Sequence, residues 1–85
     1  MKGTKVYVLS VNEIYDCDEH NTIEVYVSFE DAKKEFDRLV YNARQEAKND
    51  GWLIETDEAM DFCAYQDGDY VYYHTIITID EQEIK

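Results

Sequence analysis

Residues 28–51 constrain the fold most, because they carry every local signal of one long amphipathic helix. Ser28 and Asp31 form an S-x-x-D helix start, and the carboxylates of Glu30 and Asp31 suit the positive end of the helix dipole. Gly51 is the residue type that commonly ends a helix in the left-handed conformation. The sequence therefore predicts a helix over 29–49. Its apolar residues recur at helical spacing and form a single stripe: Phe29, Ala32, Phe36, Leu39, Val40, Ala43 and Ala47.

Alternating apolar and polar residues predict β-strands on both sides of this helix. Residues 5–14 are rich in β-branched side chains, and residues 22–28 alternate strictly. After the helix, residues 59–66 and 70–79 alternate in the same way. The Asp-Gly-Asp sequence at 67–69 predicts a tight hairpin between these last two strands.

Residues 52–58 have a less regular pattern. Trp52 and Ile54 alternate, which indicates a short strand or an extended segment, and residues 55–58 are expected to form a turn. The order is then β-β-α-β-β in a single domain, residues 1–85. One apolar stripe on one helix can cover only one face of a sheet. We therefore expect an α+β two-layer sandwich with an antiparallel sheet of four strands, or five, in an order that the sequence leaves open.

The alternation also predicts which side chains lie on the sheet face away from the helix. Ile23, Val25 and Val27 are expected to face the helix, together with Ile77 and Ile79 of the last strand. An uncovered aromatic patch on the other face is typical of an interaction surface, although tyrosines also pair well across exposed strands. The side chains expected on that face are Tyr26, Tyr65, Tyr70, Tyr72 and His74.

The negative charge is concentrated outside the predicted helix. Twenty Asp and Glu against eight Lys and Arg give a net charge of −12, yet residues 29–50 contain six acids and five bases. Such a charge disfavours direct contact with nucleic acid or an anionic membrane and favours a basic protein partner, or serves solubility alone. Asp61, Asp67 and Asp69 are expected to form a charged rim around the tyrosines. Carboxylates spaced in this way also fit a nucleic-acid mimic that occupies a phosphate-binding surface.

Signals for metal, cofactor or covalent chemistry are weak. Residues 16–20 combine Asp, Cys, Asp, Glu and His, but no second ligand pair stands at a zinc-finger spacing and no calcium loop is present. No glycine-rich phosphate loop or dinucleotide fingerprint is present either. Cys63 and His74 form a catalytic pair only if their strands are neighbours in the right register. We expect no cofactor, no metal site and no catalytic residue.

Four stretches carry a resemblance to a known group of proteins: VYVLSVNEIYD at the start, VSFEDAKKEF, GWLIE, and DGDYVYYHTIITIDEQEI near the end. With them the chain resembles a loosely defined group of small, acidic, uncharacterised proteins of bacterial genomes and mobile elements. The resemblance implies a stand-alone β-β-α-β-β domain and no catalytic residues. In size and acidity the chain is also similar to small phage inhibitors of the anti-CRISPR type.

These observations predict a small accessory protein without enzymatic activity that binds a basic protein partner through an acidic, tyrosine-bearing sheet face. The alternative is a homodimeric structural domain that covers the same face with a second copy. A small Cys/His enzyme is the least favoured interpretation. No signal-peptide core and no membrane-spanning apolar run is visible, and two distant cysteines fit a reducing compartment, so we expect a cytoplasmic protein.

Overall fold

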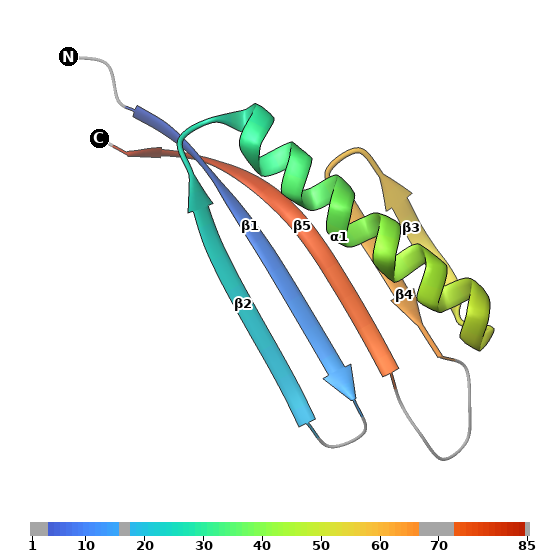
Figure 1. Ribbon diagram of the computed structural model, residues 1–85. Helices are drawn as coiled ribbons and strands as arrows, with labels where there is room; N and C mark the ends of the chain where they lie inside the picture. The colour runs from blue at the N-terminus through green and yellow to red at the C-terminus, as the bar shows by residue number, and fades with distance from the viewer. Residues whose placement is uncertain (1–3, 16–17, 67–72, 85) are drawn as a thin grey trace.

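The computed structural model describes residues 4–15, 18–66 and 73–84, which form five strands and one helix (Figure 1). The fold is α+β, as the sequence predicts, and the described elements follow in the order β-β-α-β-β-β, because the segment after the helix, indicated as a short strand or an extended segment, forms the fifth strand. The elements are β1 (Thr4–Tyr15), β2 (Asp18–Tyr26), α1 (Phe29–Asp50), β3 (Leu53–Glu58), β4 (Asp61–Tyr65) and β5 (Tyr73–Ile84).

The five strands form one open antiparallel sheet in the order β2-β1-β5-β4-β3. The two longest strands, β1 and β5, lie side by side in its centre and pair from Thr4↔Ile84 to Tyr15↔Tyr73. The strands at the two ends of the described chain therefore hold the sheet together, while β2 and β3 form its edges (Figure 1).

Several sequence-based expectations about strand limits are wrong. The strand predicted over 22–28 spans Asp18–Tyr26, and the strand predicted over 59–66 spans only Asp61–Tyr65. Residues 55–58, expected to be a turn, belong to β3, because β4 supplies their pairing partners; the turn lies at residues 59–60 instead. The last strand continues beyond residue 79, because β1 offers pairing partners as far as Thr4. The predicted hairpin at 67–69 and the start of the predicted last strand at 70–72 lie outside the described residues.

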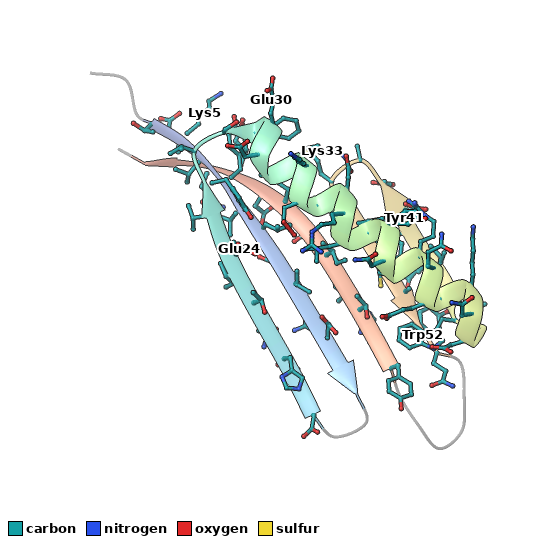
Figure 2. The ribbon with its side chains drawn as sticks, viewed as in Figure 1. Lys5, Glu24, Glu30, Lys33, Tyr41 and Trp52 are labelled. Atoms are coloured by element: carbon teal, nitrogen blue, oxygen red, sulfur yellow. The ribbon has the colours of Figure 1, made fainter. Side chains whose placement is uncertain are left out.

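Helix α1 begins and ends at the predicted signals. The hydroxyl oxygen of Ser28 accepts a hydrogen bond from the Asp31 backbone N–H at 3.3 Å, and Gly51 adopts the left-handed conformation with φ of 74°. The Trp52 backbone N–H then donates to the Ala47 carbonyl oxygen at 2.8 Å. This bond fixes the position of Trp52 directly below the last turn of the helix (Figure 2).

The hydrophobic core lies between α1 and one face of the sheet. Its largest fully buried side chains are Phe36 of the helix and Leu9, Phe62 and Ile77 of the strands. Burial of such a side chain contributes about 1.5–3 kcal/mol. The helix of 22 residues crosses the sheet diagonally, and no described element lies over the opposite face (Figure 1).

The orientation predicted for residues 22–28 is wrong. Leu9 belongs to the core, and its neighbour on β2 is Glu24, so even-numbered residues of β2 lie on the helix side. Tyr26 packs against the core there, while Ile23 and Val25 lie on the opposite face. The reason is that β2 is an edge strand at the border of the core. A tyrosine at this border covers apolar atoms with its ring while its hydroxyl donates to Glu24 at 3.1 Å.

Candidate functional site

The sheet face opposite α1, which we call the open face, is defined by four rows of directly paired residues. Each row crosses three to five neighbouring strands, and side chains in a row lie on the same face. The rows are Val25–Val8–Asp80, Ile23–Ser10–Thr78–Asp61–Glu58, Asn21–Asn12–Ile76–Cys63–Thr56, and Glu19–Ile14–His74–Tyr65–Leu53.

Aliphatic side chains reach solvent at the β2 side of the open face. Ile23 is 67% exposed and Val25 is 62% exposed, and the neighbouring Val8 is half-buried. Sequence reasoning missed these residues as surface residues, because a Val/Ile alternation is the usual mark of the core-facing side of a strand. No local signal in the sequence reveals that the helix covers the other side of β2.

Three of the predicted contact residues lie together on the open face. Tyr65 pairs with His74 across β4 and β5, both half-buried, and Asp61 is exposed at the other end of β4. Tyr26 does not join them, since it lies on the helix side. The remaining predicted residues, Tyr70, Tyr72, Asp67 and Asp69, lie outside the described residues.

The open face contains carboxylates and, among its described residues, no Lys or Arg. Its carboxylates are all exposed: Glu19, Glu58, Asp61 and Asp80, together with Glu55, which lies beside Cys63. Five bases of the chain belong to α1, on the other layer. The remaining described base, Lys5, is on the helix side of β1 and lies 3.9 Å from Glu81. The two layers thus differ in charge, and the open face is uniformly acidic at its rim.

The acidic cluster around residues 55–61 is divided between the two faces. Asp57 lies on the helix side, where the Arg44 guanidinium donates two hydrogen bonds to its carboxylate at 2.7 and 3.0 Å. These bonds lower the pKa of Asp57 below its usual value and raise the pKa of Arg44. The negative charge of Asp57 is therefore compensated by Arg44, and Asp57 does not contribute to the acidic rim.

Cys63 and His74 are neighbours on the open face, because β4 and β5 pair in a register that brings the two side chains together. The Cys63 sulfur lies 3.2 Å from His74 Nε2 and 3.9 Å from a carboxylate oxygen of Glu55. Burial raises the pKa of the Cys63 thiol, and the charges of Glu55 and Asp61 raise it further. A thiol with a raised pKa remains protonated at neutral pH and is a weak nucleophile. The two side chains are close enough for proton transfer, but the nearby carboxylates disfavour the thiolate that nucleophilic catalysis needs.

The described residues on the helix side of the sheet line two hollows that sequence reasoning missed. The larger, about 550 Å³, is lined by Glu46, Asp50, Trp52, Gln66 and Tyr73. The smaller, about 120 Å³, lies between α1 and the central strands and shares Glu46 with the larger one. Both lie where the C-terminal half of α1 approaches β5, so contacts across the two layers create them.

Among the described residues, no group of three or more His, Cys, Asp and Glu side chains is arranged to hold a metal ion. The helix of the described chain is too polar to cross a bilayer. No protein-family model, curated protein or solved structure matches this chain. Its function is therefore inferred from the geometry of its own residues.

Proposed function

We propose that this chain is a non-enzymatic binding protein whose open face contacts a protein partner with an apolar centre and a basic rim. One observation carries the proposal: Ile23 and Val25 lie largely exposed on a sheet face that no described element covers. Exposed aliphatic side chains bordered by polar residues are typical of protein-binding surfaces.

The aliphatic residues would supply the affinity. Full burial of an Ile or Val side chain contributes about 1.5–3 kcal/mol. Because about a third of Ile23 and Val25 is already buried, covering the remainder contributes about 1–2 kcal/mol for each. Tyr65 and His74 add a half-buried aromatic contact beside them.

The carboxylates of the rim would select the partner. Asp61, Asp80 and Glu19 attract a basic surface over several ångströms and repel an acidic one, which raises the association rate with the correct partner. The same rim disfavours the alternative, a homodimer through the open face, because two copies would bring identical charges together. A basic partner is therefore favoured over a second copy.

A protein surface with a basic rim normally binds phosphate groups. The proposal therefore has a second form, in which this chain acts as a nucleic-acid mimic. In that form, occupation of the open face would compete with nucleic acid, as expected for an inhibitor encoded by a mobile element. A competition assay with the captured partner and its nucleic acid separates this form from simple accessory binding.

Affinity capture from a lysate of the organism that encodes the chain tests the proposal. The experiment compares the unchanged protein with Ile23→Glu and uses Tyr41→Glu as the matched control, because Tyr41 is an exposed apolar residue on α1 (Figure 2). We expect the unchanged protein to capture one basic protein, in a complex that survives nuclease treatment and dissociates at higher salt. Ile23→Glu should abolish this capture, and Tyr41→Glu should preserve it. Equal recovery with both variants would contradict the proposal. Dimer-sized sedimentation of the unchanged protein, abolished by Ile23→Glu, would support the homodimer instead.

A further inference from the structure

The larger hollow on the helix side is lined by hydrogen-bond acceptors and aromatic rings. Glu46 and Asp50 stand four residues apart on α1, a spacing that places two side chains on the same face of a helix. Trp52 stacks on Tyr73 with the ring centroids 5.5 Å apart and the planes 12° from parallel. Among the described residues that line this hollow there is no Lys or Arg to neutralise the two carboxylates.

A buried acceptor in the same wall has no donor. Gln66 lines the hollow, and its side-chain oxygen is buried, with no hydrogen bond to it from the part of the chain that the structure describes. A buried polar atom without a partner costs about 1–3 kcal/mol, so a ligand N–H that meets this oxygen once the Gln66 amide turns toward the hollow is favoured. This atom is independent of the carboxylates, and it points to a ligand with N–H donors.

The helix contributes a third attraction for cations. The hollow lies at the C-terminal end of α1, where the helix dipole presents its negative end and favours positive charge. Carboxylates, a free amide oxygen and this dipole all attract the same kind of group. The ligand chemistry that fits is a cation with several N–H donors.

The aromatic wall distinguishes between the possible cations. A guanidinium is flat, carries five N–H donors and stacks on aromatic faces, whereas an ammonium is a compact and strongly hydrated charge. Trp is the aromatic residue that attracts a cation most strongly through its ring face. The backbone of Trp52 is held by its hydrogen bond to Ala47 and its ring by the stack on Tyr73, so the wall is formed before any ligand arrives.

From these contacts we propose that the hollow formed by Glu46, Asp50, Trp52, Gln66 and Tyr73 binds a guanidinium group. The group belongs either to an arginine side chain of a protein or to a small guanidino compound. This site lies on the helix side of the sheet and does not depend on the open face.

Trp52 is the only tryptophan of the chain, so its fluorescence reports directly on the hollow. The experiment titrates the full chain with arginine amide and, in parallel, with lysine amide. We expect a saturable change in Trp52 emission with a Kd for arginine amide at least five-fold lower than for lysine amide. Equal Kd values for the two probes, or no saturable change at millimolar concentrations in either emission or amide NMR shifts, would overturn the proposal.

Two variants show whether the carboxylates act directly. The double change Glu46→Gln and Asp50→Asn should raise the Kd for arginine amide at least five-fold, with unchanged circular dichroism. Asp61→Asn, which removes a carboxylate from the open face, should leave that Kd unchanged. An equal effect of both changes would show nonspecific attraction by net charge and would overturn the site.

A peptide arm separates the two sources of the guanidinium. Tighter binding of Gly-Arg-Gly than of arginine amide indicates an arginine side chain of a protein, and tighter binding of arginine amide indicates a small guanidino compound. Ile23→Glu, which is expected to abolish binding at the open face, should leave both titrations unchanged.

Discussion

The same substitution on opposite faces of the sheet should have very different effects on stability. Ile77 is 2% exposed in the core and Ile23 is 67% exposed on the open face, yet both lie in strands. Replacing isoleucine by threonine keeps the β-branch at both positions and changes only the apolar volume and the hydroxyl. Ile77→Thr and Ile23→Thr are therefore a matched pair. The difference between their free energies of unfolding measures whether the sheet is buried on the helix side only.

The expected magnitudes follow from burial. Ile77→Thr removes the burial of two carbon groups, about 1.6 kcal/mol at 0.8 each, and buries a hydroxyl at a cost of about 1–3 kcal/mol. The sum of about 2.6–4.6 kcal/mol should lower the Tm by more than about 10 °C in a domain of this size. Ile23→Thr changes an exposed position and should cost within about 0.5 kcal/mol, which lowers the Tm by less than about 4 °C.

Urea and thermal unfolding followed by circular dichroism measure both values, at two protein concentrations. A loss for Ile23→Thr close to that for Ile77→Thr would refute the reasoning, because Ile23 would then be covered within the protein in solution. If that loss also depended on protein concentration, a second copy would be the cover, and the open face would not be free in the isolated protein.

Three further predictions concern the contacts of single side chains. The raised pKa of Cys63 predicts slow alkylation at neutral pH, and Glu55→Gln should lower this pKa and speed alkylation when the other cysteine is serine; an unchanged rate would contradict the role of that carboxylate. The Asp57 carboxylate has a lowered pKa in the folded state, so its stabilising effect is present above the unfolded pKa of about 3.9 and is lost as the pH falls through the folded pKa. Asp57→Asn should cost no more than about 1 kcal/mol at neutral pH, because its bond to Arg44 is partly exposed, and should flatten the acid limb of a stability–pH curve. Ser28→Ala removes the helix cap and should cost about 1 kcal/mol in urea unfolding, whereas Ser28→Asp should retain most of it.

The helix was predictable because its signals are local. Ser28 and Gly51 lie at its two ends and act on neighbouring backbone groups, so the bounds follow from the sequence alone. The sheet order was not predictable, because the central pairing joins Thr4 to Ile84 across almost the whole chain. Nothing in either strand specifies the other as its neighbour.

The candidate site was predicted only in part, for a related reason. Alternation separates the two sides of a strand but does not say which side the helix covers. On β5 the prediction that Ile77 faces the core is correct. On the edge strand β2 it fails, because pairing with Tyr7 places Tyr26 on the helix side and Ile23 on the open face. The acidic hollow was missed because it depends on Trp52 meeting Tyr73 from a distant part of the sequence.

Site-specific photo-crosslinking in the organism that encodes the chain tests the central claim most directly. A photoreactive amino acid at position 25 probes the open face, and one at position 41 probes the exposed side of α1. The account predicts that position 25 traps one basic protein in high yield and that position 41 does not trap it. Trapping of that protein from position 41 alone, or crosslinks from position 25 only to a second copy of the chain, would contradict the proposed function of the open face.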